Sequence, residues 1–202
     1  SAWVSVWYAE VSALIEVFVC AVIAYGFARF EFKEKNVLFF LVLVTIIVPI
    51  QLLSIPMYIN FSHFDILGIG KFFIDTFNLP DFRPNLLNTG LTFWLPSLFG
   101  VGVRSGLFIF IYRKFFEGLP RELEEAAYVD GAGPLRTFVS VILPSSGVVF
   151  LTVTIFSTIW HWNESYMSDM YNKLNPPLAV KLDYVRNELQ KDSRSAAMAA
   201  CL

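Results

Sequence analysis

The chain has 202 residues, of which 56% are hydrophobic, 17% aromatic and only 16% charged. Soluble domains are usually about a quarter charged, and the 21 phenylalanines are more than one water-soluble core of this size would hide. The formal net charge of -2 argues against a nucleic-acid partner and against a polybasic surface anchor. We therefore expect an integral membrane protein in contact with the lipid bilayer.

Cysteine and histidine are too scattered to indicate a metal or redox site. Cys20 and Cys201 lie far apart in apolar sequence without a CxxC spacing, which favours a packing role for both. His63 and His161 have no other ligand at a metal-binding spacing. We expect no metal and no cofactor.

Four apolar stretches are long enough to cross a bilayer as helices, which takes about 20 residues. They cover residues 6–28, 37–59, 91–112 and 139–160. A further span is expected to begin at residues 195–202. Lipid offers the backbone no hydrogen-bond partners, so the spans should be helical. The predicted fold is an all-α, polytopic transmembrane bundle that forms one domain over residues 1–202.

Basic residues cluster in two connections that four spans would place on the same side of the membrane, residues 30–36 and 113–138. Because basic connections usually face the cytoplasm, we expect both of them there. The last connection, residues 162–194, is also basic, but it is long and balanced by acids, and long segments follow this rule poorly.

The loop at residues 117–138 has the pattern of a short helix followed by a corner. Pro120 suits a first helical turn, and the acids that follow it favour the positive end of a helix dipole. Gly131 would end the helix with a sharp turn. The plain alternative is an amphipathic helix that lies on the membrane surface.

The spacing within and after this loop resembles the signature loop of binding-protein-dependent ABC importer permeases. The residues that carry the resemblance are Glu125, Ala126, Ala127, Gly131, Val141, Leu143 and Pro144. Val141 is a mild departure, because the family usually has isoleucine there. Asp130 and Ala132 flank the glycine as in the carbohydrate branch of the family.

The likeness to maltose-type permeases extends beyond the loop. The stretches that carry it are residues 24–30, 48–58, 115–121 and 160–163. Compared with the family, the first helix is missing and the sixth has barely begun. The resemblance therefore implies a chain truncated to about four full spans plus the start of another, with an insertion at residues 70–90.

The resemblance implies a type I ABC importer permease in the bacterial inner or plasma membrane. Such a subunit forms half of the translocation path, here for a small sugar or oligosaccharide. Its implied partners are a cytoplasmic ATPase dimer, a second permease subunit and an extracytoplasmic solute-binding protein. The signature loop of the family is a coupling helix that docks on the ATPase.

The residues to which we assign this coupling role are Arg121, Glu124, Glu125, Ala126, Ala127, Asp130, Gly131, Ala132, Val141, Leu143 and Pro144. The chain has no glycine-rich phosphate loop ending in Lys-Ser/Thr. We therefore expect that it is not an enzyme and that ATP hydrolysis takes place on a partner subunit.

Four polar residues are candidates for the substrate path: Arg104, Gln51, Asn163 and Glu164. Arg104 lies near the middle of a predicted span, so we expect it to face a watery cavity or an acid such as Glu16. The alternative is that it binds carbonyls freed by nearby glycines or reaches the membrane surface. Asn163 and Glu164 could touch substrate or the binding protein, but an anchored helix end explains them better; Gln51 could line the path or serve a proline kink.

Other classes of protein explain less of the sequence. An ion-coupled secondary transporter would have repeated halves with intramembrane acids; Glu10 and Glu16 would serve, but no repeat is present. A membrane-embedded enzyme would need clustered His, Asp or Glu in the spans, and the predicted spans contain very few of these residues. An ABC permease for a peptide or an amino acid is the nearest alternative, and the residues around Gly131 favour sugars by resemblance.

Overall fold

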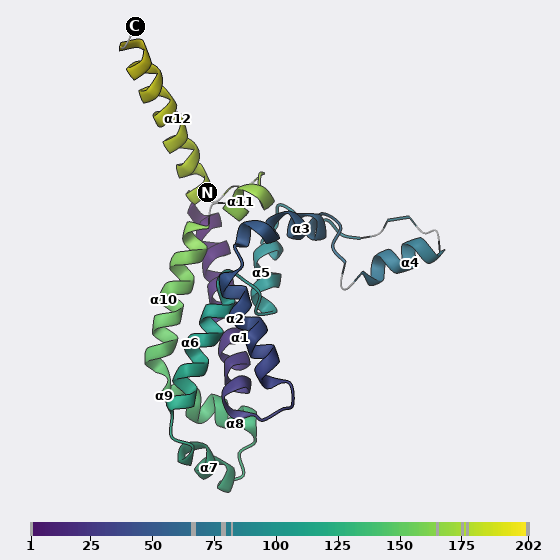
Figure 1. The fold of residues 1–202 in the computed structure, drawn as a ribbon, viewed down its shortest axis with the longest axis vertical. Helices are drawn as coiled ribbons and strands as arrows, with labels where there is room; N and C mark the ends of the chain where they lie inside the picture. The colour runs from purple at the N-terminus through teal and green to yellow at the C-terminus, as the bar shows by residue number, and fades with distance from the viewer. Residues whose placement is uncertain are drawn as a thin grey trace. The chain divides into compact units, whose positions relative to one another are not determined.

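The computed structural model describes residues 2–65, 68–77, 80–81, 83–164, 166–174, 176 and 178–200. Its regular elements are all helices in these ranges, which confirms the predicted all-α fold (Figure 1). The chain divides into two compact units. The bundle unit comprises residues 10–50 and 93–161, and the second unit comprises residues 1–9, 51–92 and 162–202.

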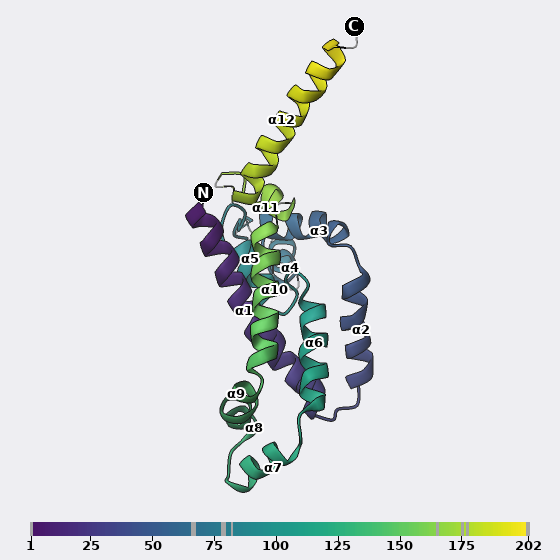
Figure 2. The ribbon, with the colours of Figure 1, turned by 90° about the vertical axis from the view of Figure 1, so that its left-hand side faces the viewer.

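The bundle unit contains one long helix and several shorter ones, with α2 packed beside α6 (Figure 2). They are α1 (Ala2–Arg29, from Glu10 onward), α2 (Lys35–Ile47), α5 (Leu91–Leu98, from Phe93 onward), α6 (Ser105–Gly118), α7 (Glu122–Val129), α8 (Pro134–Thr137), the π-helix η1 (Phe138–Ile142), α9 (Leu143–Ser145) and α10 (Gly147–Asn163).

Helix α1 has one face that packs against protein and one that does not. Small residues such as Ala21 and Ala24 are fully buried on the packed face, and small residues let helices in lipid approach closely. Leu14, Phe18 and Val22 recur every four residues on the other face and stay about half exposed. An exposed apolar stripe of this kind suits contact with lipid.

The core of the bundle unit joins α1, α6, η1 and α10. Tyr112 and Phe116 of α6 are fully buried, and Val153 of α10 is buried with them. The ring of Tyr25 lies 5.0 Å from that of Phe138, which brings η1 against α1. The core therefore holds η1, which leads toward α10, against the end of α1.

One helix is long and apolar enough to cross a membrane unbroken, from Ser5 to Arg29, among the residues that the structure describes. It matches the predicted span at residues 6–28. Two pairs of helices, each bent at a short break, would also be long and apolar enough together. The number of spans is three if each pair forms one span. Hydropathy alone does not show these breaks.

The predicted span at residues 37–59 is two helices, α2 and α3 (Ile50–Ser62). Val48 between them is extended, with ψ of 121°, because the residue before a proline is disfavoured in the α conformation. The predicted span at residues 139–160 starts in a helical segment that is bent by 83° relative to α10.

The predicted span at residues 91–112 is also interrupted. Helix α5 ends at Leu98 and α6 begins at Ser105, and Gly100 and Arg104 between them have φ of 67° and 65°. Of the predicted last segment, residues 195–200 belong to a helix that begins earlier, α12 (Leu178–Ala200), and residues 201–202 lie outside the described residues.

The second unit contains α3, α4 (Ile69–Phe77), α11 (Tyr166–Tyr171) and α12. Tyr171 ties its segments together. The hydroxyl of Tyr171 donates to the carbonyl of Ser54 at 3.3 Å, and its carbonyl accepts from the N–H of Asn88 at 2.8 Å. Its ring also lies 5.5 Å from that of Phe61.

The contact between α2 and α6 generates a prediction, because Gly106 leaves no room for a side chain. A Cβ there would lie 2.9 Å from the carbonyl oxygen of Val42. Gly106→Ala should therefore destabilise the fold by about 1–3 kcal/mol, the usual cost of overpacking. The control is Gly118→Ala on the same helix, where a Cβ meets nothing within 4 Å. Equal thermal midpoints of the two purified variants would contradict this packing.

Candidate functional site

The predicted coupling loop forms a helical elbow at one end of the bundle unit (Figures 1 and 2). The chain leaves α6 through Leu119, which is extended with ψ of 140°. It then forms α7, turns at Gly131 and enters α8, whose first residue is Pro134. We call the segment from Leu119 to Pro134 the elbow.

A hydrogen-bonded cap ends α7 and requires glycine at residue 131. Gly131 has φ of +79°, a conformation that side chains with a Cβ rarely adopt. Its N–H donates to the carbonyl of Tyr128 at 3.0 Å, and the N–H of Ala132 donates to the carbonyl of Ala127 at 2.9 Å. This pattern is the Schellman motif. The corner expected at Gly131 is therefore present.

The outer face of the elbow is exposed. Glu125, Ala126 and Asp130 are exposed, whereas Ala127 is half-buried. Val129 has 87% of its surface exposed. Because Ala126 carries only a methyl group, another protein surface can approach α7 closely at this point.

The inner face of the elbow is anchored on α1 by a buried ion pair. Nε of Arg29 lies 2.6 Å from Oε1 of Glu124, and the two side chains keep only 6% and 7% of their exposure. The hydroxyl of Tyr25 donates to Oε2 of Glu124 at 3.4 Å. Nη2 of Arg29 donates to the carbonyl of Leu119 at 2.9 Å. We call this contact the Arg29–Glu124 pair.

The other residues predicted for coupling are spread over the elbow and the helices that follow it. Arg121 is exposed, and its carbonyl accepts the N–H groups of Glu124 and Glu125 at 3.0 Å. Val141 and Leu143 are half-buried, and Leu143 packs on the core of the bundle unit. The remaining two are Ala132, which is half-buried, and Pro144, which is exposed.

Sequence reasoning did not find the role of Arg29 and Tyr25. Both residues lie in the stretch 24–30 that resembles maltose-type permeases, but no partner was assigned to either of them. The partner of Arg29 lies 95 positions further along the chain, and no local pattern indicates that pairing. One signal was present in the run of acids in α7. Helical spacing places Glu124 on a different side of the helix from Glu122 and Glu125, so Glu124 could face the protein.

The structure does not pair Arg104 with Glu16. Arg104 is exposed, and its guanidinium carbon lies 5.9 Å from the centre of the Trp160 ring. This is a cation–π distance. A left-handed backbone at Arg104 starts α6 there, so the side chain leaves the helix axis and reaches Trp160 of α10.

Glu16 instead belongs to a buried polar cluster inside the bundle unit, formed with Ser105, Ser157 and His161. Ser105 donates to Oε1 of Glu16 at 2.5 Å, and Ser157 donates to Oε2 at 3.0 Å. Nδ1 of His161 lies 3.6 Å from the same carboxylate. The four residues come from α1, α6 and α10, so the cluster joins three helices by hydrogen bonds. We call it the Glu16 cluster.

The other predicted path residues lie in the second unit, in different local settings. Gln51 is exposed at the start of α3, where its carbonyl accepts from the hydroxyl of Ser54 at 2.7 Å. Asn163 is the last residue of α10. The carboxylate of Glu164 accepts the N–H of Met167 at 3.0 Å and so caps the start of α11.

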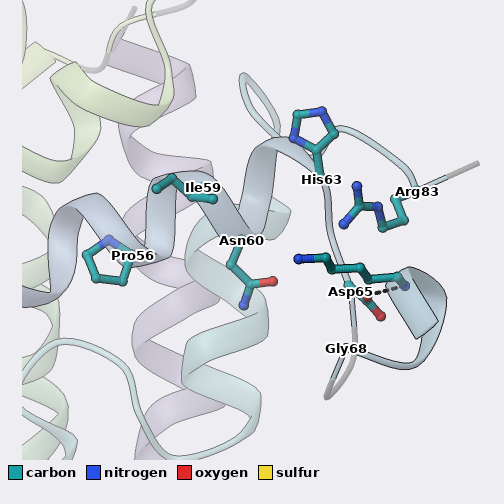
Figure 3. Close-up of a pocket in the computed structure, with 8 residues that line it drawn as sticks. Pro56, Ile59, Asn60, His63, Asp65, Gly68 and Arg83 are labelled. Carbon is teal, nitrogen blue, oxygen red and sulfur yellow. Dashed lines mark hydrogen bonds between the residues drawn. The ribbon is translucent and has the colours of Figure 1, made fainter. Parts of the chain in front are cut away.

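An open depression of about 660 Å³ lies in the second unit between α3 and the start of α4 (Figure 3). Its polar rim includes His63, Lys71 and Arg83. Asp65 is already engaged, since it accepts the N–H groups of Gly70 and Lys71 at 2.8 and 2.7 Å. None of the four predicted path residues lines this depression.

Arg83 at the rim is neutralised by an acid. Two nitrogens of its side chain donate to Asp81 at 2.9 and 2.7 Å. These hydrogen bonds hold the pKa of the Asp81 carboxyl well below its usual range. The rim therefore carries less free positive charge than its residue types indicate.

Together these features define a class of protein: an all-α membrane protein with one long apolar helix, broken helix pairs and an exposed elbow. The chain belongs to the family described as binding-protein-dependent transport system inner membrane component, which matches residues 18–200. This membership confirms the resemblance seen in the signature loop and the location in the membrane.

The relatives are longer than this chain. Diacetylchitobiose uptake system permease protein NgcG of Streptomyces coelicolor is 32% identical over 76% of this chain and 44% of its own length. Alpha-glucoside transport system permease protein AglG of Rhizobium meliloti is 31% identical over 76% of this chain and 36% of its own length. The chain thus spans less than half of either relative.

Two further similarities were found. The sn-glycerol-3-phosphate transport system permease protein UgpE of Pectobacterium atrosepticum is 29% identical over 70% of this chain and 41% of its own length. A crystal structure of a bacterial ABC transporter involved in the import of the acidic polysaccharide alginate aligns with a TM-score of 0.49 and 19% identity, covering 83% of this chain and 53% of that chain.

The cap of α7 predicts a specific response to alanine at residue 131. A left-handed conformation costs a non-glycine residue about 1–2 kcal/mol, so Gly131→Ala should make the amides of α7 exchange hydrogen about 5–30 times faster. Gly133→Ala is the control, because Gly133 has φ of -80° and a Cβ there meets nothing within 4 Å. Equal exchange in the two variants would show that the cap does not hold α7.

The Glu16 cluster predicts a loss of stability in Glu16→Ala. This change leaves the buried hydroxyls of Ser105 and Ser157 without their carboxylate acceptor, which should cost about 1–3 kcal/mol. Glu10→Ala is the control on the same helix, since Glu10 is only half-buried and accepts one long bond, 3.5 Å, from Thr158. Thermal denaturation in detergent shows which of the two variants is less stable. A Glu10 variant less stable than the Glu16 variant would refute the prediction.

Proposed function

We propose that this chain is the membrane-spanning permease half of an ATP-driven importer for a small sugar or oligosaccharide. The observation that carries the proposal is the elbow: a short, capped helix with an exposed outer face, in a chain of this family. The elbow would dock on a separate cytoplasmic ATPase. A second permease subunit and an extracytoplasmic solute-binding protein would complete the transporter.

The exposed residues of α7 suit such docking. Glu125 and Asp130 offer carboxylates to the ATPase, and Ala126 permits close approach. Glu124 is buried against α1, so it serves in this proposal as an internal anchor of the coupling loop rather than as a docking residue.

The chain after the elbow would carry a displacement into the membrane. Helices α8, η1 and α9 follow one another without a loop and lead into α10, with an 83° bend before α10. A π-helical segment such as η1 is often found at functional sites. ATP binding on the partner would bias this element between two positions, and the bias would change access to the substrate path.

The substrate class rests on the relatives. Two of them are named for diacetylchitobiose and alpha-glucoside uptake, which favours a sugar. UgpE, named for sn-glycerol-3-phosphate, is also similar, so a different small solute is the second candidate. Uptake assays with radiolabelled oligosaccharides and with glycerol phosphate distinguish the two.

A bulky residue on the docking face should uncouple transport. Ala126→Trp adds an indole where α7 is exposed, so the chain should still insert, while uptake and ATPase stimulation should fall by about tenfold or more, within the usual range of coupling effects. Glu34→Trp, in the exposed loop before α2, is the control and should leave both unchanged.

The measurement is made on the complete transporter reconstituted in vesicles with its native partners. A wild-type complex that contains no nucleotide-hydrolysing subunit would refute the importer function. Normal uptake and ATPase stimulation in Ala126→Trp would refute docking through this face of α7.

A further inference from the structure

Two charged side chains from distant parts of the chain meet, mostly buried, where the elbow touches α1. Arg29 is the last residue of α1, and Glu124 lies in the first turn of α7. Their side chains are 2.6 Å apart and keep 6% and 7% of their exposure. Such burial is unusual for charged residues unless they are paired and hydrogen-bonded.

Other ion pairs at this end of the bundle unit join residues only three or four positions apart, and each has a partly or fully exposed partner. Glu31 pairs with Lys35 at 3.0 Å within four residues, and the side chain of Glu31 is 80% exposed. Lys114 pairs with Glu117 within three residues at 2.9 Å, and its side chain is 59% exposed. Pairs of this kind contribute little to structure. The Arg29–Glu124 pair differs because it is buried and connects two separate elements.

The groups around the Arg29–Glu124 pair add one hydrogen bond on each side of it. Arg29 also donates to the carbonyl of Leu119, which is the first residue of the elbow. Glu124 also accepts from Tyr25, one turn earlier on α1. The end of α1 thus contacts the elbow at two points, in the chain that enters α7 and in α7 itself.

We propose that the Arg29–Glu124 pair makes α1 move together with α7, so that a displacement of the elbow enters the membrane through α1 as well as through α10. This inference rests on the proposed function. Arg29 and Glu124 are positioning residues: they do not touch the ATPase or the substrate, and they act by keeping two elements in one rigid group.

The chain connectivity explains why such a pair is needed. The elbow is covalently joined to α6 on one side and to α8 on the other, whereas α1 is joined to it by side-chain contacts. A buried charge that loses its partner cannot be solvated in place. Separation of α1 from α7 is therefore strongly disfavoured, and the two elements follow one another.

The first experiment compares Glu124→Gln and Arg29→Gln with the control Glu31→Gln, which breaks the exposed pair with Lys35. Each full-length variant is reconstituted with its native partners, and the number of ATP molecules hydrolysed per substrate imported is measured. We expect the two buried variants to retain the ATPase subunit but to raise this ratio about tenfold, within the usual range of coupling effects. Glu31→Gln should match the wild type.

A charge swap separates a positioning role from a merely structural one. The double variant Arg29→Glu with Glu124→Arg restores an ion pair of reversed direction and should bring the ratio back toward the wild-type value. An unchanged ratio in both single variants overturns the proposal, as does a swapped protein that assembles fully but stays uncoupled.

A distance measurement decides the question even if the variants fail to assemble. Spin labels at Glu31, two residues after the end of α1, and at Glu122 in α7 are both exposed and report the separation of the end of α1 from α7 with the pair itself intact. We expect the same separation in the nucleotide-free and ATP-bound transporter. A separation that changes between these states overturns the proposal, whereas a wild-type complex without any ATPase subunit overturns the proposed function first.

Discussion

A polar group that leaves water must find its partners inside the protein, and this constraint governs the bundle unit. Glu124 and Arg29 form an ion pair at the end of α1, and each has one further hydrogen bond, from Tyr25 and to a backbone carbonyl respectively. Glu16, in the middle of the same helix, is satisfied by hydroxyl groups of α6 and α10. Both carboxylates therefore connect α1 to other elements, because each is buried and a buried polar group needs a partner.

The same constraint explains where the helices break. A helix inside a membrane can be interrupted only where its freed backbone groups are covered by protein or by a cavity. The break at Val48 follows from Pro49, and the break before α6 combines the left-handed residues Gly100 and Arg104. A Cβ at Gly100 would lie 2.6 Å from Ile23 of α1, so this break is packed directly against the long helix.

Features encoded by neighbouring residues were predictable from the sequence. The corner at Gly131 follows from a glycine placed after an acidic, alanine-containing helix, and the long helix α1 follows from its apolar run. The interruption of the other spans was not found, because hydropathy averages over a window and does not register a single extended or left-handed residue such as Val48 or Arg104.

Long-range partners were beyond the reach of sequence patterns. The sequence suggested that Arg104 pairs with Glu16, because both charges fall within apolar stretches. Instead, the hydroxyls of Ser105 and Ser157 donate to the carboxylate of Glu16. The guanidinium of Arg104 lies over an aromatic ring. Serine hydroxyls at helical positions look unremarkable in a sequence, since most of them bond to their own backbone. Only the packing of three helices shows which of them face a carboxylate.

The two faces of α7 show why a short, exposed helix of this kind needs an internal anchor. A helix of eight residues is too short to be stable by itself in water, so contacts with the rest of the chain must hold its shape. Its outer face does not supply them, because Ala126, Val129 and Asp130 are exposed. The Schellman cap at Gly131 and the buried Glu124 supply them from the end and from the inner face. Under the proposed function, a helix held this way would reach the ATPase already folded, and a force applied to its outer face would pass to α1 instead of unfolding α7.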